Sequence, residues 1–380
     1  MYKIVCFFFC LLSVGLAAQN NICDGLKMNQ LQVVGSHNSY KKLPDKGVFR
    51  SLKFFNWIKP SLGVGGIDYG HLPLEQQFDS FAVRSIELDI YNDPKGGNFY
   101  KRYGNRLAWK SAKSREDKLK QPGMKMLHIP DIDYNTNYLT FKDALVSLRN
   151  WSLAHPTHLP IFVLIETKGE SVGDHTKAAK FTQTVPWDAA ACDSIDAEID
   201  DVFGKNAQQV LTPDELRGSY ATLDEMAVNG GWPLLDSTRG RIIFIMEGGA
   251  ADLYIQGQHA GLKGRNMFVY SQPGQPECAF VILNDSERSS TKITEAVLKG
   301  YMVRTRADSG TQEARTNNYT PWKAALNSGA QIISTDYYRP DPRHTTSKKW
   351  SDYHVKLPVT GIGRVSPVLD LPCKGNAVGE

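Results

Sequence analysis

The sequence predicts an α/β fold, a (β/α)8 TIM-type barrel with long loop insertions. Apolar runs of strand length alternate with helical patterns along most of the chain, which favours parallel pairing of the strands. Several of these runs end in polar residues, as expected where a barrel places its active site at the C-terminal ends of its strands. The chain has 380 residues and a plain barrel has roughly 250, so the surplus is expected in loops.

The N-terminal residues have the features of a secretory signal peptide, expected at residues 1–18. Lys3 is basic, residues 4–16 are apolar, and Ala17 and Ala18 supply small residues for cleavage. The apolar stretch is too short to cross a bilayer, and no later run approaches the roughly 18 residues that a span needs. Residues 19–380 are therefore predicted to form one barrel domain of a secreted or periplasmic protein without a transmembrane segment.

Eight strands are expected, with the sixth the least certain because residues 266–270 compete for its place. Helical patterns separate several of them, for example at residues 140–153 and 311–328. Three longer segments, residues 39–82, 91–123 and 169–240, are expected as insertions on the catalytic face. The expected strands are residues 31–36, 83–90, 124–127, 160–167, 241–246, 280–283, 300–305 and 331–335.

Charge and cysteine content exclude some classes of function. The net charge of +4 is too small to indicate nucleic-acid binding. Four cysteines would remain after signal removal, an even number in an oxidising compartment, which predicts two disulfides of open pairing. One pair could instead stay reduced in a structural role. The cysteines lack CxxC spacing and so do not indicate a zinc site; they are Cys23, Cys192, Cys278 and Cys373.

The second expected strand carries two acids on one face. Glu87 and Asp89 are two residues apart and therefore point the same way, while their apolar neighbours point the other way. Two acids inside a barrel mouth are hard to explain without a cation, because buried like charges repel and their desolvation is costly. The alternative is an exposed edge strand whose acids are solvated.

Two further oxygen ligands follow other expected strands. Glu166 ends the fourth strand and Asn38 follows the first. Together with Glu87 and Asp89 they offer only oxygen atoms, which suits Ca²⁺ or Mg²⁺ better than Zn²⁺. Ca²⁺ is favoured, because Mg²⁺ usually takes fewer protein ligands.

Two histidines also lie at expected strand ends. A lone histidine is more often structural than catalytic, but His37 and His128 occupy equivalent positions beside the carboxylates, which predicts proton transfer. His155 and His158 precede the fourth strand, on the opposite face, and are expected to be structural. Paired histidines next to a hard cation indicate cleavage of a phosphodiester.

These motifs, in this order, resemble the catalytic half-barrel of phosphoinositide-specific phospholipases C. The remainder is similar to the secreted, calcium-dependent phosphoinositide phospholipase C family of microbes, part of the PLC-like phosphodiesterase superfamily. The lipid-binding and calcium-binding modules of the eukaryotic enzymes have no counterpart here. The segments that carry this second similarity are residues 221–223, 231–234, 239–244, 303–308 and 328–337.

The resemblance implies roles for the motif residues. It makes His37 and His128 the catalytic pair. The implied reaction cleaves phosphatidylinositol-type lipids to diacylglycerol and an inositol (cyclic) phosphate, by attack of the inositol 2-hydroxyl on phosphorus. His128 would protonate the leaving oxygen, and His37 would contact the phosphoryl group or act as the base. The implied Ca²⁺ ligands are Asn38, Glu87, Asp89 and Glu166.

Some roles stay open. A metal-bound carboxylate, Glu87 or Glu166, could replace His37 as the base. Lys168 and Arg304 are candidates for phosphate or headgroup contact. Arg304 could equally form an internal salt bridge, with Asp308 or Asp336 as its partner.

The implied partner is a phospholipid, met transiently at a membrane surface, and the protein is expected to be a monomer. Residues 53–59 mix aromatic residues and lysines in an insertion on the active-site side. They could form an interfacial patch, but an insertion helix packed on the barrel is the favoured interpretation.

Two other functions fit the same fold. A glycerophosphodiester phosphodiesterase would act on deacylated lipids with similar residues, but such enzymes usually begin with His-Arg-Gly, whereas this chain has His37-Asn38-Ser39. A barrel that binds inositol phosphates or glycans without turnover would have no need of paired acid–base groups, which argues against that alternative.

Overall fold

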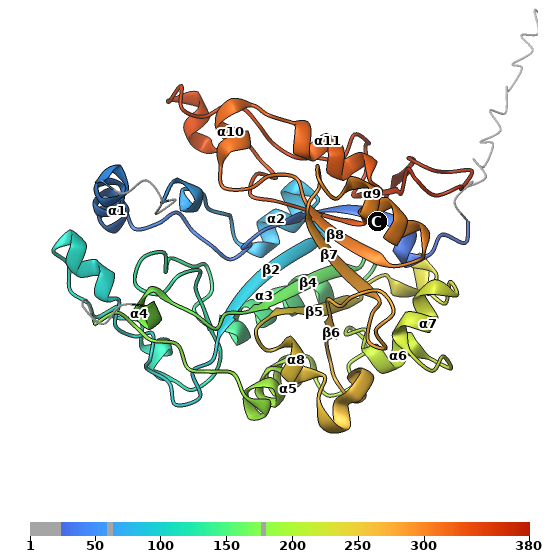
Figure 1. Cartoon of the computed structure of the whole chain (residues 1–380), viewed down its shortest axis with the longest axis horizontal. Helices are drawn as coiled ribbons and strands as arrows, with labels where there is room; N and C mark the ends of the chain where they lie inside the picture. The colour runs from blue at the N-terminus through green and yellow to red at the C-terminus, as the bar shows by residue number, and fades with distance from the viewer. Residues whose placement is uncertain (1–23, 59–63, 176–179) are drawn as a thin grey trace, which may run out of the picture.

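The computed structural model describes residues 24–58, 64–175 and 180–380, and Figure 1 shows their arrangement. The expected signal peptide and Cys23 lie outside the described residues. No helix in the described part of the chain is long and apolar enough to cross a membrane.

Eight parallel strands form the barrel, in the order β6-β5-β4-β2-β1-β9-β8-β7. A parallel bridge between Tyr270 and Phe280 joins the two ends of this order, which closes the circle. The predicted (β/α)8 barrel is therefore confirmed. Its strands are β1 (Leu31–Ser36), β2 (Ser85–Tyr91), β4 (Ile161–Thr167), β5 (Ile242–Gly248), β6 (Phe268–Val269), β7 (Phe280–Asp285), β8 (Met302–Arg306) and β9 (Ile332–Thr335).

Helices surround the strands and also fill the long connections (Figure 1). Residues 270–279, all of them described, connect β6 to β7 without a helix. The helices are α1 (Lys46–Ile58), α2 (Leu74–Phe81), α3 (Phe141–Ala154), α4 (Val172–His175), α5 (Ala189–Phe203), α6 (Pro213–Arg217), α7 (Leu223–Val228), α8 (Ala251–Tyr254), α9 (Ser290–Leu298), α10 (Gln312–Thr316) and α11 (Thr320–Asn327), with short 3-10 helices that include η4 (Tyr103–Ala108).

Local sequence signals set several helix starts. The Thr140 side chain accepts a hydrogen bond from the backbone N–H of Asp143 at the start of α3. Asp188 does the same for Ala191 at the start of α5. Such caps satisfy N–H groups that the first turn of a helix leaves without partners.

Most of the core is one continuous apolar cluster that extends along the chain from Leu26 to Val378, beside a small second cluster around Tyr91 and Phe99. The residues of β4 from Ile161 to Ile165 are all buried, because a parallel barrel strand has side chains packed on both faces. A continuous core agrees with a single barrel domain over residues 19–380, and that boundary stays a prediction.

Two strand predictions need correction. The run at residues 124–127 forms β3 (Lys125–Met126), which pairs antiparallel with the end of β2 and lies off the barrel circle. The two candidates for the sixth strand both exist, as β6 and β7, so the barrel still has eight strands. A short apolar run has no feature that reveals the direction in which it will pair.

Two short strands close the other end of the barrel. β10 (Gly363–Val365) pairs antiparallel with the beginning of β1, and β11 (Ala377–Val378) pairs with β10. The Glu380 side chain then forms an ion pair with Arg84, which precedes β2. The C-terminal residues are thus fixed at the N-terminal ends of the strands.

The prediction of two disulfides is wrong. Cys192, Cys278 and Cys373 are each free and buried, whereas two bridges would need at least one bond among these three. All three belong to the main apolar core, where each packs as a small apolar side chain. An even number of cysteines is typical of proteins from an oxidising compartment. It does not tell which cysteines lie close enough in the fold to form a bond.

Candidate active site

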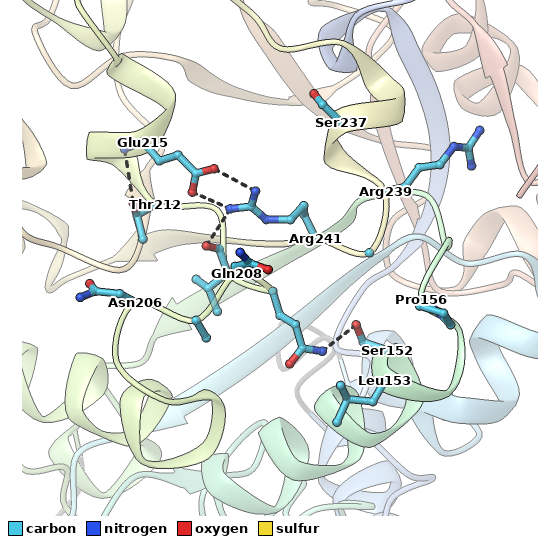
Figure 2. A pocket seen from close by; sticks show the side chains of 14 residues that line it. Ser152, Leu153, Pro156, Asn206, Gln208, Thr212, Glu215, Ser237, Arg239 and Arg241 are labelled. Carbon is cyan, nitrogen blue, oxygen red and sulfur yellow. Dashed lines mark hydrogen bonds and ion pairs between the residues drawn. The ribbon is translucent and has the colours of Figure 1, made fainter.

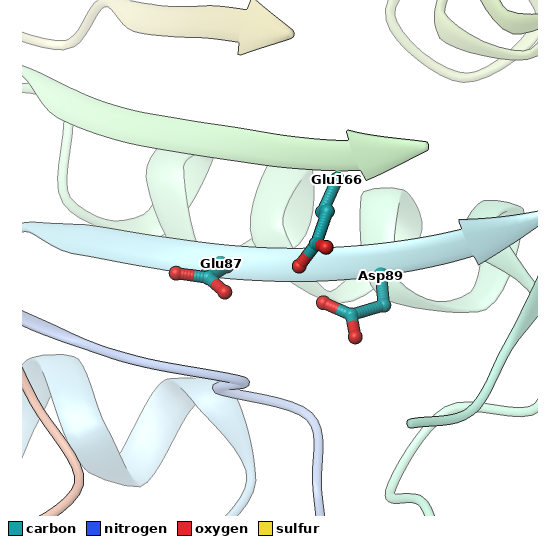
Figure 3. A group of neighbouring side chains, drawn as sticks. All are labelled: Glu87, Asp89 and Glu166. Carbon is teal, nitrogen blue, oxygen red and sulfur yellow. The ribbon is translucent and has the colours of Figure 1, made fainter. Parts of the chain in front are cut away.

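Three carboxylates meet at the C-terminal ends of β2 and β4 (Figure 3). Glu87 and Asp89 point to the same side of β2, and Asp89 is paired in register with Glu166 on β4. Each residue offers one oxygen, and these atoms lie within 4.8 Å of one another. Because β2 lies between β1 and β4 and its acids are buried, the alternative of a solvated edge strand is wrong.

Asn38 adjoins this carboxylate cluster from the end of β1. One terminal atom of its amide lies 2.9 Å from Oδ1 of Asp89, and the other lies 2.8 Å from the Tyr69 hydroxyl. A nitrogen facing Asp89 would donate a hydrogen bond, whereas an oxygen there would need a cation between the two groups. Either orientation keeps the Asn38 amide next to Asp89, and its role as a fourth oxygen ligand stays a prediction.

The electrostatics of the cluster favour a cation. Burial raises the pKa of Asp89 well above its usual value, and the charges of Glu166 and Glu87 raise it further. Lys168 supplies one positive charge, with its Nζ 2.9 Å from Glu166 Oε1 and 3.4 Å from Asp89 Oδ2. A hard divalent cation would relieve the remaining repulsion, and oxygen donors alone fit Ca²⁺ rather than Zn²⁺.

His37 follows β1 and is held by a carboxylate. Its Nδ1 lies 2.7 Å from Oδ1 of Asp336, which follows β9. Its Nε2 lies 3.4 Å from Glu87 Oε1 and 3.2 Å from Nη1 of Arg306. If Nδ1 carries the proton and donates to Asp336, then Nε2 accepts the hydrogen bond from Arg306.

The pKa shifts agree with this arrangement. Burial, together with the charge of Arg306, lowers the pKa of His37. Burial opposes ionisation of Asp336, but the charges of His37 and Arg306 outweigh it and lower the pKa of Asp336 to about 2. At neutral pH the pair therefore holds an ionised carboxylate against a largely neutral imidazole.

His128 has a similar carboxylate partner on the opposite side of the cluster. It follows β3, which pairs with the end of β2 just beyond Asp89. Its Nδ1 lies 2.7 Å from Oδ2 of Asp133, and this same oxygen lies 3.2 Å from Nζ of the buried Lys41. Nε2 has no hydrogen-bond partner among the described residues, and β3 is not one of the eight barrel strands.

Arg304 forms an ion pair with the carboxylate cluster. It extends from β8, is buried, and forms an ion pair with Glu87, while Nη1 donates to Asn284 Oδ1 at 2.6 Å. The expected salt bridge to Asp308 or Asp336 is therefore wrong. Arg306, two residues further along the same face, pairs with Asp336 instead, at 3.3 Å.

Several site residues were missed by sequence reasoning. Arg306, Asp336 and Glu247 each lie at the end of a strand. Like Glu166, each is a charged residue at the end of an apolar run, and that sequence pattern could have identified them. Glu247, on β5, is paired in register with Glu166 on β4, and burial raises the pKa of Glu247. Asp133 had no such signal, because it lies in a loop outside any barrel strand.

The opposite end of the barrel lacks this chemistry. His158 is buried and makes hydrogen bonds to Ser152 at 2.8 Å and to the carbonyl of Leu159 at 2.6 Å, which confirms its structural role. A cavity of about 620 Å³ lies beside these residues, between the end of α3 and the start of β5 (Figure 2). Both arginines that line it form ion pairs, Arg241 with Glu215 and Arg239 with Asp236.

Comparisons with known proteins identify a matching family and similar solved structures. The model of the family described as "Phosphoinositide phospholipase C, Ca2+-dependent" matches residues 26–367. A calcium-dependent phosphoinositol-specific phospholipase C from the Gram-negative bacterium Pseudomonas sp, in apo form, has 15% identity and a TM-score of 0.50, with 84% of this chain and 92% of that chain covered. The Ca²⁺-dependent phosphatidylinositol-specific phospholipase C of Streptomyces antibioticus has 16% identity and a TM-score of 0.48, with 85% and 98% covered. No curated protein matches the chain.

The extent of the family match decides the assignment. Residues 26–367 include every strand of the barrel and all the site residues described above. The calcium dependence that names the family also agrees with the oxygen ligands gathered at the barrel mouth. The chain therefore belongs to the Ca²⁺-dependent phosphoinositide phospholipase C family, whose members are phosphoric diester hydrolases.

Proposed function

We propose that this protein is a secreted phosphodiesterase that cleaves phosphatidylinositol-type lipids to diacylglycerol and an inositol cyclic phosphate, which water could then open. The observation that carries this proposal is the buried carboxylate cluster of Glu87, Asp89 and Glu166, flanked by two histidines that each have a carboxylate partner. Membership of the family supports the same reaction.

Asn38, Glu87, Asp89 and Glu166 would hold the calcium ion. Bound there, Ca²⁺ would lower the pKa of the inositol 2-hydroxyl and offset charge on the phosphoryl group. Lys168, next to the same carboxylates, would contact the phosphate or the headgroup. Arg304 would orient Glu87 through their ion pair, and its direct contact with substrate stays a prediction.

The two histidines would divide the proton transfers. His128 would give the proton on Nε2 to the diacylglycerol oxygen as its bond to phosphorus breaks, since Asp133 stabilises the protonated ring at Nδ1. His37 would accept the 2-hydroxyl proton at Nε2, or, once protonated, donate a hydrogen bond to the phosphoryl oxygen. Glu87 lies 3.4 Å from the same nitrogen and, like Glu166, is the alternative base.

The test compares phosphatidylinositol with glycerophosphoinositol as substrate, each with Ca²⁺ and with excess EGTA. Phosphorus NMR should detect a cyclic inositol phosphate from the lipid, formed only with Ca²⁺. His37→Ala and His128→Ala should abolish most of this activity, whereas His155→Ala, at the opposite end of the barrel, should retain it. Full turnover in EGTA, or a preference for glycerophosphoinositol, would refute the proposal.

A further inference from the structure

The Asn38 amide lies between two groups with different hydrogen-bonding capacity. One of its terminal atoms is 2.9 Å from Oδ1 of Asp89, and the other is 2.8 Å from the Tyr69 hydroxyl. An ionised carboxylate accepts hydrogen bonds only, whereas a hydroxyl can accept or donate one. Asn38 is buried, so an amide N–H that lost its protein partner there would be costly. The orientation of the amide therefore depends on these two neighbours.

The two possible orientations differ in what they offer to a cation. With Nδ2 toward Asp89, the amide donates to the carboxylate and accepts from the Tyr69 hydroxyl, so Oδ1 points away from the carboxylate cluster (Figure 3). With Nδ2 toward Tyr69, the amide donates to the hydroxyl, and Oδ1 faces the oxygens of Asp89. Only this second orientation gathers the amide oxygen and the carboxylates into one set of oxygen ligands.

Tyr69 is held in place from several sides. It comes from the insertion after β1 and is buried. Its ring packs against the rings of His71 and Tyr337, with centroids 5.5 and 6.5 Å away, and the ammonium group of Lys41 lies 4.4 Å from its centroid. Lys41 also donates to the Tyr69 carbonyl at 2.8 Å. The hydroxyl therefore has a fixed position, to which the Asn38 amide must adapt.

We propose that Tyr69 is a positioning residue for the cation: its hydroxyl accepts a hydrogen bond from Nδ2 of Asn38 and so directs Oδ1 toward the carboxylate cluster. With phenylalanine at this position, Asp89 would be the only one of the two neighbours able to accept from Nδ2, and the amide would turn Oδ1 away from the cation. The inference rests on the proposed function, because it presupposes that Asn38 binds the Ca²⁺ of that reaction.

Calorimetric titration of Ca²⁺ without substrate tests this role. Tyr69→Phe should raise the Kd for Ca²⁺ about tenfold, at the lower end of the roughly 10–100-fold effect of losing a residue that supports a metal ligand. Circular dichroism in EGTA should show that the variant is folded. An unchanged Kd would overturn the proposal.

Tyr138→Phe is the matched control. The Tyr138 hydroxyl also has partners inside the protein, 2.9 Å from the backbone nitrogen of Leu74 on α2 and 3.1 Å from Ser147 Oγ on α3. Both helices lie outside the barrel, so this variant should bind Ca²⁺ as the wild type does. A loss equal to that of Tyr69→Phe would mean that any lost internal hydroxyl weakens the site, which would also overturn the proposal.

A double-mutant cycle shows whether Tyr69 acts through Asn38. Asn38→Gly removes the amide but tolerates the left-handed backbone of this position, where φ is 50°, and it should itself weaken Ca²⁺ binding. In that background Tyr69→Phe should cause no further loss. An equal loss in both backgrounds would overturn the proposal, because the tyrosine would then act by another route, such as its contact with Nδ1 of His37 at 3.2 Å.

Nuclear magnetic resonance tests the orientation in the wild type, and the variants serve only to assign its signals. In Ca²⁺-saturated protein labelled on the asparagine amide nitrogens, the NH₂ signal that Asn38→Gly removes should show a nuclear Overhauser effect to the ring protons of Tyr69. An NH₂ group without that effect would place Oδ1 against the tyrosine and overturn the proposal.

The outcomes separate this proposal from the proposed function. Unchanged Ca²⁺ affinity in Asn38→Gly would refute Asn38 as a ligand, and the role of Tyr69 with it. Weaker binding by Asn38→Gly but not by Tyr69→Phe would overturn the role of Tyr69 alone. If both variants bind Ca²⁺ more weakly but the wild type does not cleave phosphatidylinositol, the proposed function is contradicted and the positioning role is supported.

Discussion

Asp133 accepts a hydrogen bond from Nδ1 of His128, over a distance of 2.7 Å. The carboxylate is fully buried, and the ammonium group of Lys41, 3.2 Å away, offsets its charge. Lys41 in turn donates to the carbonyls of Ile67 and Tyr69, each at 2.8 Å. The ring of His128 is therefore oriented by a chain of contacts that begins in the loop after β1.

Loss of His128 should depend on the leaving group. A diacylglycerol alkoxide needs a proton as it departs, whereas a nitrophenolate hardly does. His128→Ala should therefore lose about 10²–10⁴-fold in kcat/KM on phosphatidylinositol, the usual contribution of a general acid, and much less on a nitrophenyl inositol phosphate. Equal losses on both substrates would contradict the role, and the same leaving-group rescue in His37→Ala would reverse the two assignments.

Asp133→Asn should impair catalysis in the same way as His128→Ala, but less strongly. The amide keeps the shape of the side chain but carries no negative charge to stabilise an imidazolium, so proton donation by His128 should be slower. We expect about a 10–100-fold loss in kcat/KM on phosphatidylinositol and a much smaller loss on a nitrophenyl inositol phosphate. Asp236→Asn, at a position that is 86% exposed, is the control. Equal losses on both substrates would mean that Asp133 only supports the fold.

The part of the site that could be predicted is the part that depends on residues close together in the sequence. Glu87, Asp89 and Glu166 each end an apolar run, and the alternation of side chains along a strand then fixes the face on which they lie. The barrel itself followed from the alternation of strands and helices. These features depend on neighbours within a few residues, which a sequence displays directly.

The partners of those residues could not be predicted, because they depend on how distant strands meet. Arg304 pairs with Glu87 across the barrel, 217 positions away, and not with the nearby Asp308. The antiparallel direction of β3 depends on a turn in the loop between residues 91 and 125 that has no apolar periodicity. The free cysteines also reflect distances in the folded core, which spacing along the chain does not reveal.

Removal of the Lys168 charge should strengthen calcium binding. Its ammonium group lies 2.9 Å from Glu166 and 3.4 Å from Asp89, so it competes electrostatically with a cation held by the same carboxylates. Lys168→Met should lower the Kd for Ca²⁺ about tenfold, as expected for one charge at this range in a partly screened site. Calorimetric titration measures the change.

The same variant should bind substrate less well, because the proposed phosphate contact is lost. KM for phosphatidylinositol should rise while calcium affinity improves. Lys292→Met, on α9, is a control remote from the site. Weaker Ca²⁺ binding in Lys168→Met would mean that the lysine organises the carboxylates rather than opposing the cation.

The buried pair of Arg304 and Glu87 should make stability depend on calcium. Arg304→Met leaves Glu87 without its partner, and breaking a buried ion pair costs about 3–5 kcal/mol in the free energy of unfolding. Ca²⁺ should restore part of this loss, because it neutralises the same carboxylate. Denaturant titrations in EGTA and in Ca²⁺ measure both values.

Arg288→Met gives the matched comparison for a surface pair. The Arg288 side chain is 90% exposed and pairs with Asp285 at 3.6 Å, an arrangement that contributes about 0–1 kcal/mol. The unfolding free energy that Arg288→Met loses should be small and independent of Ca²⁺. If Arg304→Met were equally harmless, the ion pair seen in the structure would have no net effect on stability.

The buried Asp308 carboxyl should make the free energy of unfolding fall as pH rises. Burial, with the charge of Asp336, raises the pKa of the Asp308 carboxyl to about 7, whereas an aspartate in an unfolded chain titrates at about 3.9. Between these values the folded state holds a proton that the unfolded state does not. The associated stability is fully present below about pH 4 and is lost as pH rises through 7.

Replacement of the carboxyl by an amide removes this titration. Asp308→Asn should therefore flatten the pH dependence, so that the difference in unfolding free energy between variant and wild type changes by on the order of 2 kcal/mol from pH 5 to pH 8, in favour of the variant at pH 8. Asp336, whose pKa is about 2, titrates below this range, and His37 is present in both proteins. Urea titrations at the two pH values, in EGTA, measure the change. Parallel pH curves for the two proteins would show that the Asp308 carboxyl is already ionised at pH 5, held so by Arg306 and by its hydrogen bonds from Thr335 and the backbone of Asp336.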